Sequence, residues 1–328
     1  MKILIGCASL VGLFFGIRIY RNYFVWRRCK DNQNLKGKTV IITGANSGIG
    51  KATAQELVLR GAKVIMACRD EAKTIEAIND IKKHTKNNGE MVYRHVDLAS
   101  FDSIEKFTNE IIQNEETIDV LINNAGVYKP PFGLTVNGFE TQFQVNHLSH
   151  ALLTLLLMPK MQKSGQRTQS ISKVIMVTSV LAKKGVINED DFIKGAAKLD
   201  KYDPYKSYCN SKLANIIFSK ELQKRLERND QPVHLYLSSP GIVWTNLNRH
   251  NKIPWWQLLF IAPFALLFLK TPKQGCQTIV YCAVNDSLQS GQFYRDCKLY
   301  NWKNPASVND SASSNVYDWT YQAIEKHL

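Results

Sequence analysis

The sequence lacks the features that indicate a disulfide scaffold, a metal cluster or a repeat protein. Its seven cysteines are an odd number and include no Cys-x-x-Cys pair, so neither a disulfide framework nor a cysteine metal site is expected. A reducing compartment is the simpler expectation. No internal repeat or low-complexity tract interrupts the 328 residues, which suffice for one large α/β domain.

The chain also lacks a concentrated nucleic-acid-binding segment, although its formal net charge is +14. The basic residues are scattered, without an arginine-rich arm or a stripe in which aromatic and basic residues alternate. We therefore expect no nucleic-acid partner. Membrane phospholipid and a phosphorylated small molecule are anionic partners that account for the charge more simply.

Charge is absent from residues 3–17, and basic residues follow this run at positions 18, 21, 27, 28 and 30. The run ends without a small-x-small cleavage site, which disfavours a cleaved signal peptide. Its helix would span roughly 22 Å, short of a ~30 Å hydrocarbon core unless Arg18 snorkels and lengthens the span. A helix packed on the domain is the alternative. We favour an uncleaved membrane anchor over residues 1–30, with the basic side in the cytoplasm.

A glycine-rich loop between a predicted strand and a predicted helix indicates a dinucleotide site. The β-branched run Thr39–Thr43 predicts a buried strand, TGANSGIG occupies residues 43–50, and residues 51–60 have helical periodicity. Such a loop brings the backbone close to a pyrophosphate and directs a helix N-terminus at its charge. A phosphate-binding NTPase loop would need Ser or Thr where this chain has Ala52. An ordinary tight turn is the remaining alternative.

The end of the second predicted strand bears on the choice of cofactor. Residues 63–67 predict the strand, and Arg69 lies where NAD-dependent folds place an acid that binds the ribose hydroxyls. Arginine offers a planar fork to a 2′-phosphate, and Lys51 adds a second positive charge. NADP(H) is therefore the expected cofactor, with a solvated surface arginine as the alternative. Asp70 is expected to cap the following helix.

Tyr208 and Lys212 lie four residues apart on a predicted helix, so their side chains share one face. A phenol with a pKa of ~10 is a poor acid–base catalyst at neutral pH, and a neighbouring ammonium favours its ionised form. Such a pair can pass a proton to or from a substrate oxygen. The same spacing occurs twice more, but Pro204 disfavours a helix in one copy and Tyr294 lies in a predicted strand in the other.

These features belong to an ordered series that resembles the short-chain dehydrogenase/reductase family over residues 36–300. The series is TGANSGIG at 43–50, Asp97-Leu98, NNAG at 123–126, Asn146, Ser179, Tyr208, Lys212, Pro240-Gly241 and Thr245. The resemblance implies a single α/β domain with a doubly wound parallel sheet of the Rossmann type. The N-terminal anchor helix would precede this domain, and a helical extension over residues 301–328 would follow it.

The resemblance also implies a role for each site residue. Tyr208 would exchange the proton, while Lys212 would hold the cofactor ribose and lower the phenol pKa together with the oxidised ring. Ser179, which ends the apolar run 174–179, would bind the substrate oxygen. Asn146 would hold a water that links Lys212 to solvent, unless it is a plain helix-surface residue. The implied cofactor-binding residues are Gly44, Asn46, Ser47, Gly48, Ile49, Gly50, Arg69, Asp97, Leu98, Asn124, Ala125, Gly126, Tyr208, Lys212, Pro240, Gly241, Val243 and Thr245.

Three shorter motifs resemble the microsomal retinol dehydrogenase group: VNHLSH at 145–150, SKLAN at 211–215 and TPKQG at 271–275. That resemblance implies an NADP(H)-dependent enzyme on the cytoplasmic face of the endoplasmic reticulum membrane. Its substrates would be retinal or other apolar aldehydes and ketones. A ketosteroid or isoprenoid dehydrogenase with the same machinery is one alternative. A silent NADP-binding scaffold is another, against which the intact Ser179, Tyr208 and Lys212 set argues.

Residues 255–269, WWQLLFIAPFALLFL, carry no charge and fall where the family has its variable substrate-binding segment. A core helix is one interpretation of so short an apolar run. We favour an apolar lid that dips into the membrane and admits a lipid-soluble substrate.

Overall fold

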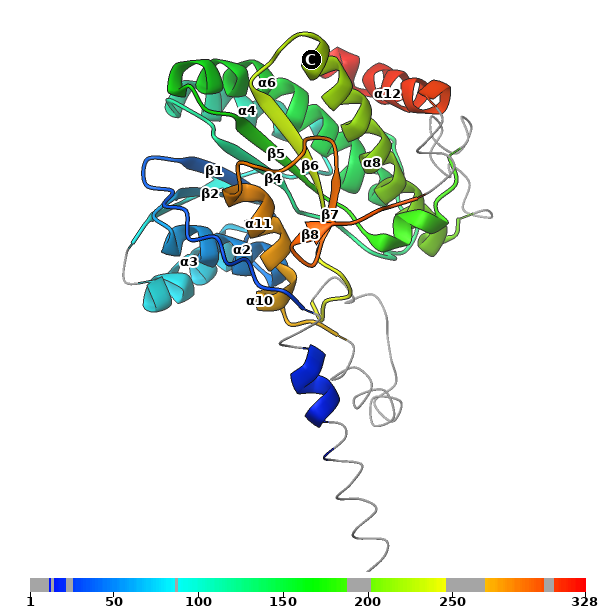
Figure 1. The fold of residues 1–328 in the computed structure, drawn as a ribbon. Coiled ribbons are helices and arrows are strands. Elements are labelled where there is room, and N and C mark those ends of the chain that lie inside the picture. Colours follow the sequence, from blue (N-terminus) through cyan, green and yellow to red (C-terminus); the bar gives the residue numbers. More distant parts are fainter. Residues whose placement is uncertain are drawn as a thin grey trace, which may run out of the picture.

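The structure is a computed structural model that describes residues 12, 15–21, 26–85, 88–187, 202–245, 269–303 and 310–328. An eight-stranded sheet with the order β3-β2-β1-β4-β5-β6-β7-β8 forms its centre (Figure 1). All neighbouring strands from β3 to β7 are parallel, and β8 joins the edge antiparallel to β7. The strands are β1 (Thr39–Thr43), β2 (Lys63–Cys68), β3 (Glu90–His95), β4 (Val120–Asn123), β5 (Ser172–Val177), β6 (Val233–Ser239), β7 (Phe293–Arg295) and β8 (Lys298–Leu299).

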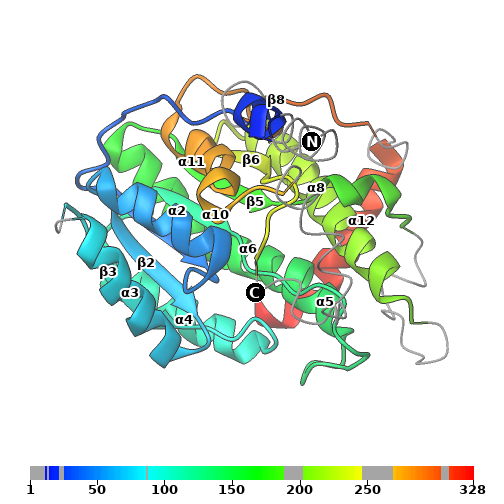
Figure 2. The same ribbon diagram turned by 90° about the horizontal axis from the view of Figure 1, so that it is seen from below.

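Helices cover both faces of the sheet (Figure 1, Figure 2). Alternate residues of a buried strand point to opposite faces, and in β1 Ile41 joins one core cluster while Val40 and Ile42 join the other. One face carries α2 (Gly48–Leu59), α3 (Glu71–Thr85), α10 (Pro272–Gly275) and α11 (Gln277–Val284), and the other carries α4 (Phe101–Asn114), α6 (Ser149–Thr168), α8 (Pro204–Arg228) and α12 (Asp310–Ile324). The predicted doubly wound parallel α/β fold is confirmed.

The strand order reverses between β1 and β4, which lie side by side with Ile41 opposite Leu121. From β1 the chain winds outward to β3, then returns to β4 and winds the other way. In open parallel sheets, ligands bind outside the carboxyl ends of the strands at such a switch point. The loops that follow β1, β4 and β5 are therefore where a ligand is expected to bind.

Several local predictions agree with the structure. The strand predicted at Thr39–Thr43 has those bounds. Asp70 caps α3, because its carboxylate accepts a hydrogen bond of 3.0 Å from the Lys73 N–H. Ser179 differs slightly from expectation: β5 ends at Val177, and Ser179 caps the short 3₁₀ helix η3 (Val180–Lys184) instead of ending the strand.

The C-terminal helix α12 packs on α8. The rings of Phe218 and Tyr317 are stacked with centroids 5.4 Å apart, and the guanidinium of Arg225 lies 3.7 Å from the Tyr317 centroid. Val316 and Ile324 belong to the same hydrophobic cluster as α4, α6 and α8. Residues 310–328 are thus part of this core layer, and the short helix η7 (Glu325–His327) ends the chain.

Within the described residues, no helix has the length and apolarity needed to cross a membrane. Most of the apolar run at 3–17 and all of residues 255–268 lie outside those residues. The expected anchor and the expected lid therefore stay predictions.

Candidate active site

The glycine loop after β1 forms a cradle whose atoms leave no room for side chains. A Cβ on Gly50 would lie 2.3 Å from the Gly44 carbonyl oxygen, and Gly44 itself has a φ of +65°, which glycine adopts without strain. Ser47 precedes α2 but makes no side-chain cap bond to it, and no acidic residue lies in the first turn. The first N–H groups of α2 are therefore suited to an anionic group such as a pyrophosphate.

Thr43 joins this cradle to the NNAG segment after β4. Its hydroxyl oxygen accepts hydrogen bonds of 2.9 Å from the N–H groups of both Asn124 and Ala125. The Asn124 side chain returns a bond of 2.8 Å to the Thr43 carbonyl oxygen. Two predicted cofactor segments, far apart in sequence, are thus held together at the switch point. This role of Thr43 was not predicted from the sequence, although a hydroxyl at the end of an apolar strand could have indicated it.

The loop after β6 closes against the same cradle. A Cβ on Gly48 would lie 3.3 Å from the Thr245 methyl group, so Thr245 lies beside the glycine loop. Val243 is paired with Lys270 and packs against Gly275. Pro240 is buried at the end of β6, and Gly241 turns the chain with a φ of +81°. Of the predicted residues of this loop, Thr245 therefore lies beside the glycine loop, and Val243 lies close to it through Gly275.

The predicted adenosine end lies at the ends of β2 and β3. The Arg69 side chain is 70% exposed, and its guanidinium lies 3.8 Å from the Asp97 carboxylate. Leu98 is buried beside them. Lys51, expected as a second charge for a 2′-phosphate, instead forms an ion pair of 2.7 Å with Asp80 on α3. Arg69 is thus the basic side chain that lies, largely exposed, at the end of β2 where a residue for the 2′-phosphate was expected.

Tyr208, Lys212 and Ser179 meet beyond the carboxyl end of β5. Tyr208 and Lys212 lie one turn apart on α8, buried to 6% and 4% exposure. The Ser179 hydroxyl lies near enough to the Tyr208 phenol to favour its ionised form. The Lys212 ammonium donates a bond of 3.0 Å to the Val177 carbonyl and lies 5.9 Å from the centroid of the Tyr208 ring.

Burial dominates the ionisation of both groups. It raises the pKa of Tyr208 well above its ordinary value, although the nearby Ser179 hydroxyl acts in the opposite direction. It lowers the pKa of Lys212 to about 8. A lowered phenol pKa was expected, but desolvation is the largest cause of the shift, and the Lys212 ammonium is directed at the Val177 carbonyl instead. At neutral pH the phenol keeps its proton.

Asn146 is fully buried, which excludes the helix-surface alternative. It lies in η2 (Gln144–Leu148), a π-type turn ahead of α6, and such turns are frequent at functional sites. Its side chain accepts a bond of 2.8 Å from the Val127 N–H and donates to the Val127 carbonyl at 3.0 Å and the Ser211 hydroxyl at 3.1 Å. Asn146 thus clamps the segment after NNAG to α8. A Cβ on Gly126 would lie 3.1 Å from Asn146 Oδ1 and 3.8 Å from Lys212 Nζ.

Comparison with known proteins agrees with this arrangement. Residues 38–191 match the family model for short chain dehydrogenases. Retinol dehydrogenase 14 of Homo sapiens is 40% identical over 323 residues, which cover 93% of this chain and 90% of the relative. Retinol dehydrogenase 13 of Homo sapiens is 40% identical over 295 residues, covering 88% and 86%.

The chain belongs to the short-chain dehydrogenase/reductase family. Within this family of oxidoreductases, its similarity to retinol dehydrogenases confirms the group expected from the three short motifs. A crystal structure of a Mycobacterium Paratuberculosis protein shares 29% identity and a TM-score of 0.70, covering 91% of this chain and 97% of the other. A Pseudomonas aeruginosa RhlG/NADP active-site complex shares the fold at 21% identity and a TM-score of 0.59, covering 79% and 94%.

Two further side chains lie near Tyr208, Tyr128 directly and Lys129 through the rings of Tyr128 and Tyr205, and neither was predicted from the sequence. Tyr128 packs the edge of its ring on Tyr208, with centroids 4.7 Å apart and an interplanar angle of 78°. Lys129, in a left-handed conformation with φ of +51°, places its ammonium within 5.3 Å of the Tyr128 centroid and 5.2 Å of the Tyr205 centroid. No local sequence pattern distinguishes Tyr128, because its contact depends on how the NNAG segment lies against α8.

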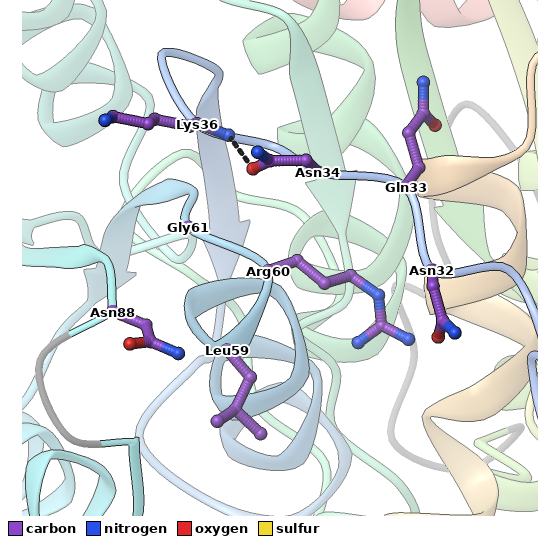
Figure 3. Close-up of a pocket in the computed structure, with 8 residues that line it drawn as sticks. All are labelled: Asn32, Gln33, Asn34, Lys36, Leu59, Arg60, Gly61 and Asn88. Carbon is purple, nitrogen blue, oxygen red and sulfur yellow. Dashed lines mark hydrogen bonds between the residues drawn. The ribbon is translucent and has the colours of Figure 1, made fainter.

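A separate hollow of about 570 Å³ lies at the amino ends of the strands, on the opposite edge of the sheet (Figure 3). It is lined by Asn32, Gln33, Asn34, Lys36, Leu59, Arg60, Gly61 and Asn88. These residues come from the segment before β1, the end of α2 and the turn before β3. No predicted site residue lines it, so the predicted active site and this hollow are distinct places.

Proposed function

We propose that the protein is a membrane-associated, NADP(H)-dependent oxidoreductase that interconverts retinal or other apolar aldehydes and ketones with their alcohols. The observation that carries this proposal is the meeting of Ser179, Tyr208 and Lys212 beside the glycine cradle. The retinol dehydrogenase names of the relatives support the apolar substrate class.

The bound cofactor would supply or accept the hydride. Tyr208 donates its proton to the substrate oxygen during reduction, and its raised pKa keeps that proton in place at neutral pH until the oxygen gains charge. The Ser179 hydroxyl, which lies beside the phenol, orients the same substrate oxygen. Lys212 lies one turn away, buried and able to donate to a cofactor ribose.

The cofactor's diphosphate would lie on the cradle of Gly44, Gly48 and Gly50, where side chains do not fit. Its adenosine end would lie beside Asp97, Leu98 and Arg69. The exposed guanidinium of Arg69 supports a preference for the 2′-phosphate of NADP(H).

One contact supports the membrane association. Arg18, directly after the first apolar run, donates a hydrogen bond of 3.1 Å to the carbonyl of Leu269, which ends the second apolar run. Arg18 and Leu269 therefore lie together, and the helical segment 15–21 lies below α10 in Figure 1. We propose an anchor over residues 1–30, a catalytic domain over 36–300 on the cytoplasmic face of the endoplasmic reticulum, and a lipid-facing lid over 255–269.

Tyr208→Phe tests the proposed reaction. Removing the phenolic hydroxyl should lower kcat for retinal and NADPH by at least about 100-fold, because general acid catalysis contributes 10²–10⁴-fold. Initial rates of cofactor oxidation measure the effect, with Tyr321→Phe on the exposed face of α12 as the matched control. Full activity in the Tyr208 variant would refute the proton donor. A wild-type protein that binds NADPH without turnover of any apolar carbonyl would support the scaffold alternative.

A further inference from the structure

Two histidines with no role in the proposed chemistry are linked to the carbonyl group of Asn146, His150 directly and His147 through Asn215. His147 and His150 are both fully buried. Burial lowers the pKa of His147 to about 4 and that of His150 to about 3. Both rings are therefore neutral at neutral pH, and each has one N–H donor and one bare nitrogen.

The hydrogen-bond partners of His147 fix which nitrogen carries its proton. The Asn215 amide group donates 2.9 Å to the Asn146 carbonyl, so its oxygen must face His147 Nδ1, which lies 2.9 Å away. An amide oxygen only accepts, and Nδ1 therefore carries the proton. The bare Nε2 faces the Thr320 hydroxyl on α12 at 2.9 Å, and that hydroxyl also bonds to the Val316 carbonyl at 2.7 Å, so its one proton is shared by two acceptors.

The hydrogen-bond partners of His150 likewise fix which of its nitrogens carries the proton. The Thr43 hydroxyl oxygen already accepts from two backbone N–H groups, those of Asn124 and Ala125, so its own proton must be donated. His150 Nε2 lies 3.0 Å away, closer than the Ile122 carbonyl at 3.4 Å. With Nε2 as the acceptor, His150 Nδ1 carries the proton and donates to the Asn146 carbonyl at 3.1 Å.

Two chains of hydrogen bonds thus end on one carbonyl oxygen. One runs from Thr320 through His147 and Asn215, and the other runs from Thr43 through His150. The first begins on the C-terminal helix, and the second begins at the strand that carries the glycine cradle. Asn146 is consequently held from both sides while its side chain clamps the NNAG segment to α8.

We propose that His147, His150 and Thr320 are positioning residues of the active site, and that Thr320 makes the C-terminal helix α12 a working part of it. The assignment rests on the proposed function for its catalytic consequence. The hydroxyl of Thr320 orients His147, and His147 orients Asn215 against Asn146. Through the Asn146 clamp, this orientation fixes the distance between the NNAG segment and the Tyr208–Lys212 face of α8.

Thr320→Val in the full-length protein tests the proposal, because valine keeps the shape and removes the hydroxyl. We expect kcat to fall about 10-fold, since displacement of a reacting group by 1 Å costs up to ~100-fold. KM for NADPH should change less than 2-fold, because no residue of the glycine cradle is altered. Thr320→Ser retains the hydroxyl and should restore kcat to within 2-fold of wild type.

Thr85→Val is the matched control. Like Thr320, Thr85 is buried on a helix and donates to the carbonyl four residues earlier, but within the described residues its hydroxyl bonds to no histidine. Both valine variants should lose a similar amount of thermal stability, and only Thr320→Val should lose kcat. Equal kcat values for Thr320→Val and wild type, or an equal loss of kcat in the Thr85 control, would overturn the proposal.

Histidine-selective ¹⁵N spectra test the network without any substrate. Wild-type protein at neutral pH should show two neutral histidines protonated at Nδ1, and Thr320→Val should shift the Nε2 resonance of one of them. If either ring is charged or protonated at Nε2, the assignment of the protons is wrong. These spectra decide the network even if the wild-type protein reduces no carbonyl, so failure of the proposed function would be recognised separately.

Discussion

At the scale of single residues, the proposed cofactor preference depends on Arg69. Arg69→Ala should raise KM for NADPH about 10-fold and leave KM for NADH within 2-fold. A hydrogen-bonded charge contributes ~1.5–3 kcal/mol, and the 70% exposure of this side chain places the effect at the lower end. Steady-state kinetics with both cofactors measures the ratio of KM for NADPH to KM for NADH.

Lys51→Ala is the control for this prediction. Lys51 lies close to the cradle in sequence, but its ammonium is paired with Asp80. Its replacement should therefore change neither KM value by more than about 2-fold. If both variants lose NADPH binding equally, the discrimination arises from general positive charge and not from Arg69.

The identity of the predicted site residues could be derived from the sequence more readily than their pKa values and ion pairs. The Tyr208–Lys212 spacing and the glycine loop are local patterns, and the structure places them together. The ionisation of Tyr208 depends on burial by segments far away in sequence, and the expected lowering of its pKa was wrong for the protein alone. The pairing of Lys51 with Asp80 likewise depends on how α2 packs on α3.

At the scale of secondary-structure elements, β-branched runs predicted β1 and β2 well because buried parallel strands are almost continuously apolar. The π-type turn η2 was not predicted, and Asn146 was expected in an ordinary helix. Its geometry depends on hydrogen bonds from Asn215 and His150, one of which comes from 69 residues away. Periodicity within a short window contains no information about such partners.

The turn from β1 into α2 brings the backbone at Gly50 close to Gly44 and Asn124. Gly50→Ala places a methyl group 2.3 Å from the Gly44 carbonyl and 2.6 Å from the Asn124 amide nitrogen. We expect a loss of about 1–3 kcal/mol in the free energy of unfolding, together with weaker NADPH binding. Denaturant titration and fluorescence titration measure the two effects.

Gly133→Ala is the corresponding control, because the nearest atom to its added Cβ is the Thr141 hydroxyl at 3.5 Å, an ordinary contact. This variant should leave the free energy of unfolding and the affinity for NADPH close to the wild-type values. A Gly50 variant that binds NADPH as tightly as wild type would show that the close backbone approach has no part in holding the cofactor.

At the scale of the whole molecule, Arg18 contacts Leu269, which directly precedes the Lys270 that pairs with the loop after β6. Exposed Ile242 and Trp244 follow β6 near the same edge, where Trp244 and Ile242 pair with Lys270. Apolar side chains next to a basic N-terminal flank are the arrangement expected of a domain held against an anionic membrane surface. A lipid-soluble substrate would then reach Tyr208 directly from the bilayer.

Leu10→Arg tests whether the first run inserts into the bilayer. An arginine near the centre of a membrane helix costs about 2.5–3.5 kcal/mol, and this run is already short for a full span. The variant should therefore move from the alkali-resistant membrane fraction to the supernatant, while Leu59→Arg, at an exposed position on α2, should stay with the membrane.

Activity on a small soluble carbonyl should be unchanged in the displaced variant, because the site residues lie in the folded domain. Its rate on retinal supplied in vesicles should fall several-fold, and retention of both variants in the membrane fraction would exclude the run as the anchor.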